Sequence, residues 1–204
     1  MDYILHYSGV VPRYVSTCID NIKKTDPESN IIFLGNSDFQ KENVTFINTN
    51  DISDEFLKSL YDINYFSDEK NQLWETSLAR IFLIHNAAKK LKVSKFIHFD
   101  TDVLIYKPYE SLKSCFKENK LNITPADENR LIFGYSFIDG IENLSLICEK
   151  VLEVLENAKH YEDNYYFGNK LNEMVILNII YIENPDLFNL LDTIPKLNNE
   201  IIFD

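Results

Sequence analysis

Glycine, cysteine and long apolar runs are scarce in this 204-residue chain, and each scarcity excludes a class of protein. Only 5 glycines stand beside 45% hydrophobic and 13% aromatic residues, which argues against disorder and against a flexible repeat array. No apolar stretch approaches the roughly 18 residues that a transmembrane helix needs. The opening Met1-Asp2-Tyr3 also lacks the basic start of a signal peptide. We therefore expect a single compact domain over residues 1–204.

The three cysteines, Cys18, Cys115 and Cys148, are odd in number and far apart, and none belongs to a CxxC pair. This spacing indicates neither a disulfide framework nor a zinc site. Cys18 and Cys148 fall on apolar helical stripes, where we expect buried thiols. Unpaired cysteines and the absence of a signal sequence together predict a cytoplasmic protein.

Basic residues are also in short supply, since 20 Lys and Arg face 32 Asp and Glu, for a formal net charge of −12. The electric field of a protein with this negative net charge repels polyanions, which argues against nucleic acid and anionic membranes as partners. An acidic protein can still bind a nucleotide diphosphate when a divalent cation lies between the two sets of negative charge.

Hydrophobic periodicity predicts short strands that alternate with amphipathic helices. A strand, a helix and two further strands open the chain, which is typical of an α/β fold with a mostly parallel central sheet flanked by helices. Residues 51–73 are weakly periodic and predict helical turns and loop, and 160–168 predict an aromatic, acidic loop. Strands are expected at 3–7, 31–34, 44–47, 96–99 and 131–138, and helices at about 12–25, 74–90, 142–157 and 171–181.

One segment carries the clearest chemical signal. The apolar strand 96–99 ends in Asp100-Thr101-Asp102, and apolar residues follow immediately. In open α/β sheets, ligands bind beyond the carboxyl ends of the strands. Two carboxylates there repel each other and lose their water, a cost that a divalent cation removes. Oxygen ligands suit Mn²⁺ or Mg²⁺, so Asp100 and Asp102 are predicted metal ligands, with an ordinary surface turn as the alternative.

This segment and the helix before it resemble a known family. Arg80-Ile-Phe-Leu-Ile, followed by Lys95-Phe-Ile-His-Phe-Asp-Thr-Asp-Val-Leu-Ile, is similar to the DxD region of GT-A glycosyltransferases. The similarity is greatest to family 8, which includes glycogenin and lipopolysaccharide galactosyltransferases. It implies a GT-A fold in which Asp100 and Asp102 hold Mn²⁺ against the donor diphosphate. It also places Arg80 and Thr101 at the donor.

The resemblance is fainter towards the two ends of the chain. Residues 3–9 look like the family's first strand and loop, which implies that Tyr7 and Ser8 bind the nucleotide, although a core role is equally open for Tyr7. Residues 133–140 are similar to the family's strand beside the sugar.

Residues 172–178 resemble the family's helix start at the reaction centre, with Glu173 in its acidic position and Met174 in place of a glutamine. The family's C-terminal histidine ligand has no counterpart. Water or His160, the last histidine, would then complete the metal shell.

These residues predict a metal-dependent hexosyltransferase (EC 2.4 class) that uses a nucleotide sugar, expected to be UDP-linked, and a glycan, lipid-linked or protein acceptor. Arg80 suits phosphate or vicinal hydroxyls, with a structural ion pair as the alternative. An inverting enzyme needs a carboxylate base at the acceptor hydroxyl, for which Glu173, Asp139 and Asp127 are candidates. The family resemblance favours retention of configuration instead.

Two other functions fit parts of the pattern. A haloacid-dehalogenase-type phosphatase also uses strand-end aspartates with Mg²⁺. That class carries its nucleophile strand near the N-terminus and a second acidic pair downstream, whereas here a β-α-β pattern precedes Asp100 and no such pair follows. A nucleotide-sugar-binding module without turnover is the other alternative, suggested by the short chain and the missing histidine.

Overall fold

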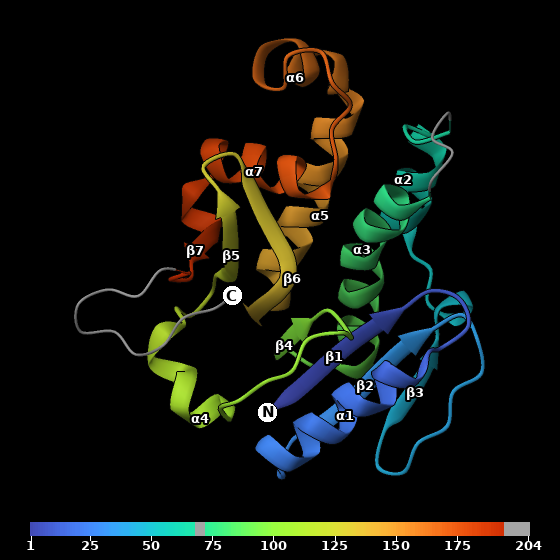
Figure 1. The fold of residues 1–204 in the computed structure, drawn as a ribbon. Helices are drawn as coiled ribbons and strands as arrows, with labels where there is room; N and C mark the ends of the chain where they lie inside the picture. The colour runs from blue at the N-terminus through green and yellow to red at the C-terminus, as the bar shows by residue number, and fades with distance from the viewer. Residues whose placement is uncertain (68–71, 194–204) are drawn as a thin grey trace.

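The computed structural model describes residues 1–67 and 72–193, in which helices cover both faces of a seven-stranded sheet (Figure 1). The strands are β1 (Asp2–Tyr7), β2 (Asn30–Gly35), β3 (Thr45–Asn48), β4 (Lys95–Phe99), β5 (Leu121–Asp127), β6 (Arg130–Asp139) and β7 (Phe188–Leu190). The helices are α1 (Arg13–Thr25), α2 (Glu55–Ile63), α3 (Leu73–Leu91), α4 (Tyr109–Leu112), α5 (Ile141–Glu156), α6 (Ala158–Tyr165) and α7 (Glu173–Glu183).

The strand order is β3-β2-β1-β4-β6-β5-β7. All strand pairs are parallel except those that β6 makes with β4 and β5. The predicted α/β fold with a mostly parallel sheet is therefore confirmed, with β6 as the single reversed strand of the described sheet.

One predicted loop is wrong. Residues 160–168 were expected to be irregular because they are rich in aromatic and acidic residues, but helix α6 occupies most of them. Contacts between successive turns support this helix: Lys159 pairs with Asp163 at 2.7 Å, and the rings of Tyr161 and Tyr165 lie 5.7 Å apart. In the weakly periodic segment 51–73, α2 is the main element, and residues 68–71 lie outside the described ranges.

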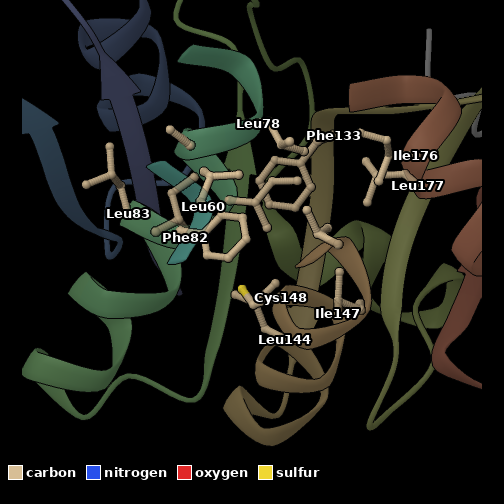
Figure 2. Close-up of a cluster of buried hydrophobic side chains, with 14 of the residues drawn as sticks. Leu60, Leu78, Phe82, Leu83, Phe133, Leu144, Ile147, Cys148, Ile176 and Leu177 are labelled. Atoms are coloured by element: carbon tan, nitrogen blue, oxygen red, sulfur yellow. The ribbon is translucent and has the colours of Figure 1, made fainter. Parts of the chain in front are cut away.

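Side chains that alternate along the central strands fill two hydrophobic cores, one on each face. Tyr3 and Phe99 face α1, whereas Ile4 and Phe96 face the layer of α2, α3, α5 and α7. In that second layer, side chains of α3 lie against β6 and α5, as Figure 2 shows. Cys148 is among them, and it and Cys18 are buried free thiols. Across the described ranges, every helix is too short or too polar to cross a bilayer.

The sheet divides at its centre. β1 and β4 pair only through Asp2 with Phe96 and Tyr3 with Ile97, and then they diverge. His98 bridges the gap, because its Nδ1–H donates a 2.7 Å hydrogen bond to the Ile4 carbonyl. Burial holds the pKa of His98 well below its ordinary value, so the ring stays neutral. A crevice between diverging parallel strands is where open α/β sheets bind ligands.

Candidate active site

A cleft of about 820 Å³ opens at the carboxyl ends of β1 and β4. Its walls come from the end of β1, the start of α3, the turn after β4 and the first turn of α7. Its volume lies in the usual range for small-molecule sites. The predicted residues that line it are Tyr7, Ser8, Arg80, Asp100, Thr101, Asp102 and Glu173.

Helix α7 begins where it does because Asn172 caps it. The Asn172 side chain accepts a 3.2 Å hydrogen bond from the Val175 N–H, which satisfies a donor that the first turn leaves unpaired. This start places Glu173 and Met174 in the wall of the cleft, although Glu173 is otherwise buried.

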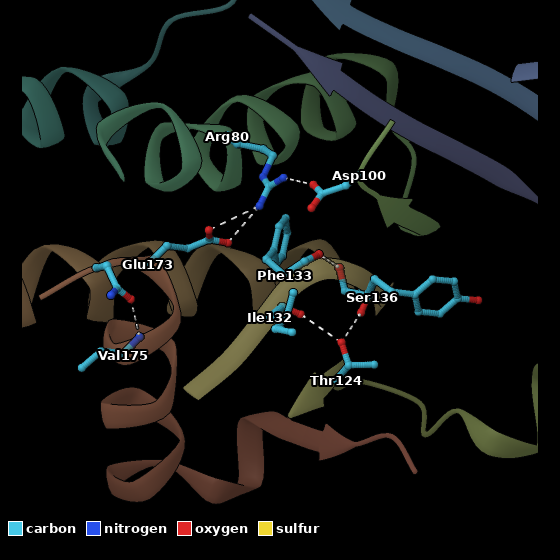
Figure 3. A network of polar contacts seen from close by, with 10 residues as sticks. Arg80, Asp100, Thr124, Ile132, Phe133, Ser136, Glu173 and Val175 are labelled. Carbon is cyan, nitrogen blue, oxygen red and sulfur yellow. Dashed lines mark hydrogen bonds and ion pairs between the residues drawn. The ribbon is translucent and has the colours of Figure 1, made fainter. Parts of the chain in front are cut away.

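Arg80 lies at the centre of an ion-pair network (Figure 3). Its Nη1 pairs with Asp100 Oδ1, and its Nη2 donates to the two Glu173 carboxylate oxygens at 3.1 and 3.3 Å. The guanidinium carbon lies 5.8 Å from the centroid of the Phe133 ring, within cation–π range. The Glu173 side chain is 5% exposed, whereas that of Asp100 is 41% exposed. Arg80 thus connects a buried carboxylate on α7 to an accessible carboxylate after β4.

Burial and ion pairing act in opposite directions on this network. Desolvation raises the pKa of Glu173 above its ordinary value, and Arg80 limits that rise. Desolvation also acts to lower the pKa of Arg80, but the charges of Glu173 and Asp100 outweigh it and the pKa rises. His6 lines the same cleft and stays neutral, since burial and the Arg80 charge lower its pKa to about 3. Arg80 is therefore the cation of the network.

Space for the Asp100 carboxylate depends on Gly134 in β6. The Asp100 N–H donates a 2.9 Å hydrogen bond to the Gly134 carbonyl. A Cβ at position 134 would lie 2.5 Å from Asp100 Oδ2 and 3.2 Å from Ile132 Cγ2. In the sequence this glycine is one position of 133–140, the stretch that is similar to the family's strand beside the sugar. A glycine inside a strand pattern is the signal that could have identified it, because such a position marks close approach of another group.

Asp100 and Asp102 are the residues that could hold a divalent cation. Both line the cleft, and Asp102 is exposed, with no side-chain hydrogen bond or ion pair to any described residue. Within residues 1–67 and 72–193, no group of three His, Cys, Asp or Glu side chains is placed to share a metal ion. Mg²⁺ commonly takes one or two carboxylates, with water and substrate phosphates completing its shell. The pair therefore fits a cation shared with a diphosphate.

Three predicted residues lie outside the lining of the cleft. Asp139 pairs with Lys95 at 2.9 Å at the amino end of β4, opposite the end that carries the aspartates. Asp127 lies in the β5–β6 hairpin, where it accepts a 2.7 Å hydrogen bond from Arg130 Nε. His160 belongs to α6. These positions give no support to a base at Asp139 or Asp127, nor to a metal ligand at His160.

The fold is the GT-A fold of glycosyltransferases. Neither a protein-family profile nor a curated protein sequence matches the chain. Mouse xyloside xylosyltransferase 1 superposes with a TM-score of 0.63 at 13% identity, over 94% of this chain and 86% of that one. LgtC superposes with a TM-score of 0.57 at 12% identity, over 95% and 73%. GlyE of Streptococcus pneumoniae superposes with a TM-score of 0.52 at 13% identity, over 93% and 44%.

Proposed function

We propose that this chain is a glycosyltransferase that moves a hexose from a UDP-linked donor to a hydroxyl acceptor. The observation that carries the proposal is the convergence of Arg80, Asp100, Asp102 and Glu173 on one cleft at the carboxyl ends of β1 and β4. The fold shared with glycosyltransferases supports it. Because one fold hosts many activities, the side chains of the cleft weigh more than the fold.

Asp100 and Asp102 would hold a Mn²⁺ or Mg²⁺ ion against the donor diphosphate. When bound, such an ion supplies charge stabilisation to a departing diphosphate. Two contacts within the protein fix the position of Asp100. Arg80 pairs with its Oδ1, and its backbone N–H donates a hydrogen bond to the Gly134 carbonyl. Tyr7, Ser8 and Thr101 line the same cleft and would contact the nucleotide.

Glu173 would orient the sugar through Arg80 rather than take a proton from the acceptor. Both of its oxygens accept hydrogen bonds from Arg80, so the carboxylate is committed to an ion pair. An inverting reaction needs a free carboxylate base near the acceptor. Glu173 is therefore not free to act as that base. Because the sequence resembles the family 8 enzymes, we propose transfer with retention of configuration.

A thermal-shift panel of nucleotide sugars, with and without Mn²⁺, tests the donor and the metal together. A ligand that binds only the folded state stabilises it by about 2.7 kcal/mol at a hundredfold excess over its Kd. We expect UDP-sugars to raise the melting temperature only with Mn²⁺, and we expect Asp102→Ala to lose the response. Asp127→Ala, outside the cleft, should respond as the wild type does. Equal responses in wild type and Asp102→Ala would refute the metal assignment.

UDP release, measured with and without sugar acceptors, distinguishes transfer from binding without turnover. A donor that binds with Mn²⁺ but releases no UDP, to water or to any acceptor, would favour the nucleotide-sugar-binding module. Phosphatases of the haloacid-dehalogenase type also carry a lysine downstream of their nucleophile strand. The described lining of the cleft contains no lysine, so it does not support this alternative.

A further inference from the structure

A second cavity opens beside the cleft, towards α2, with a volume of about 420 Å³. The two cavities share a wall formed by His6, Ser8, Asn36, Gln72 and Thr76. We call this second cavity the side cavity. The turn after β3, helix α2 and the start of α3 form the rest of its wall. Neither predicted metal ligand lines it.

The lining of the side cavity is polar but nearly uncharged. Hydroxyl and amide groups of Thr49, Asn50 and Ser53 join those of the shared wall, and Leu57 and Leu83 add apolar surface. Among the described residues that line it, Glu75 is the one acidic side chain, and none is lysine or arginine. A phosphate or carboxylate ligand would find no cation among these described residues, whereas their hydroxyls and amides both donate to and accept from a neutral polar group. This chemistry favours an uncharged ring that carries hydroxyls.

Glu75 is placed to anchor such a ring. It lies in the first turn of α3 and makes no side-chain hydrogen bond or ion pair within the described chain. By contrast, Asp100 and Glu173 in the neighbouring cleft are already paired with Arg80. A free carboxylate accepts charge-assisted hydrogen bonds, which are stronger than those between neutral groups.

Tyr61 supplies an aromatic surface beside this carboxylate. It lines the side cavity and is 48% exposed, so part of its ring is accessible. Burial and the charge of Glu75 together raise the pKa of Tyr61, which agrees with both side chains facing the same space. Aromatic rings combine a flat apolar face with a polar edge and suit the faces of sugar rings.

We propose that the side cavity binds a neutral, hydroxyl-bearing ring, with Glu75 accepting from its O–H or N–H groups and Tyr61 packing against its face. The identity of the ring rests on the proposed function, which supplies two sources: the acceptor sugar and the nucleoside end of the donor. Both are uncharged and carry adjacent hydroxyls.

Saturation-transfer NMR without metal tests the side cavity separately from the diphosphate site. The probes are uridine, methyl β-galactoside and methyl α-glucoside, none of which is charged. We expect at least one to bind the wild type, and Glu75→Gln and Tyr61→Ala to weaken its affinity about tenfold each. Uridine binding assigns the cavity to the nucleoside, and binding of a methyl glycoside assigns it to the acceptor. Glu149→Gln, on the exposed face of α5, is the matched control and should bind as the wild type does.

Failure of all three probes to bind, or equal binding by wild type and Glu75→Gln, would overturn the inference. The outcome is separable from that of the proposed function. If the wild type responds to UDP-sugar with Mn²⁺ but binds no neutral probe, the proposed function is supported and the side-cavity site is refuted. A wild type that binds a neutral probe through Glu75 but never responds to a nucleotide sugar keeps the site and loses the proposed function.

Discussion

Replacing Arg80 with leucine is expected to lower the free energy of unfolding by about 3–5 kcal/mol at neutral pH. The substitution leaves the Glu173 carboxylate, only 5% exposed, without its ion-pair partner. A buried charge without compensation is costly, because the interior solvates it poorly. Asp100 is 41% exposed and regains water more easily, so most of the loss should arise at Glu173. Urea unfolding of the wild type and the variant measures the difference.

Arg130→Leu is the matched control, because Arg130 forms a surface ion pair with Asp127. Losing an exposed pair of this kind costs about 0–1 kcal/mol. Equal losses for Arg80→Leu and Arg130→Leu would contradict the buried-pair interpretation.

The pH dependence of the same variant gives a second readout. In the wild type Arg80 acts to lower the pKa of Glu173, so its removal should move that pKa further above the ordinary value of 4.5. A carboxyl group whose pKa is raised on folding binds more protons in the folded state, so stability falls as pH rises above 4.5 through the folded pKa. The penalty of Arg80→Leu should therefore be smallest in acid and grow towards neutral pH. If the loss of unfolding free energy does not change with pH, it does not arise from the unpaired Glu173 carboxylate.

Replacing Gly134 with alanine is expected to weaken Mn²⁺ affinity about 10–100-fold, the range seen when groups that orient metal ligands are changed. The added Cβ would lie 2.5 Å from Asp100 Oδ2, so the carboxylate has to move. The same crowding should cost about 1–3 kcal/mol of stability, as overpacking does elsewhere. Calorimetric titration of Mn²⁺ in the presence of UDP, together with urea unfolding, measures both effects.

A double-mutant cycle separates the clash with the carboxylate from other effects of the new methyl group. In an Asp100→Ala background the carboxylate is gone, and the 3.2 Å contact with Ile132 Cγ2 is the tight approach that remains. The stability penalty of Gly134→Ala should therefore shrink in that background. Additive penalties would show that Asp100 does not need the space that Gly134 leaves.

Local patterns in the sequence were enough to predict β4 and α3. An apolar run directly precedes the aspartates that follow β4, and Arg80 lies within a long pattern of helical periodicity on α3. Both patterns can be recognised from residues that are close together in the sequence. Strand β5 was not predicted, because Pro125 and Asn122 interrupt its apolar pattern. Its strand conformation depends on β6 and β7 as neighbours and on the Asn122 side chain, which donates a 3.1 Å hydrogen bond to the Phe137 carbonyl.

The composition of the site was predictable where residues follow a strand directly, as Asp100 and Asp102 do. The contributions of Gly134 and Glu75 were not, because each depends on elements that only the fold brings together. The candidate Asp139 shows the same limit. Its position depends on the reversed direction of β6, which places the end of that strand beside the start of β4. No spacing within the sequence encodes that reversal.

The charges that line the cleft also determine the order in which its ligands can arrive. Among the described residues of the cleft, three carboxyl groups face one guanidinium, which already pairs with two of them, in a chain of net charge −12. A bare nucleotide diphosphate would approach against a repulsive field, which added salt would screen, so its capture should become faster as ionic strength rises. A cation that enters first, or that travels with the donor, turns the encounter attractive. Under the proposed function, the metal therefore binds before the donor or together with it, and not after it.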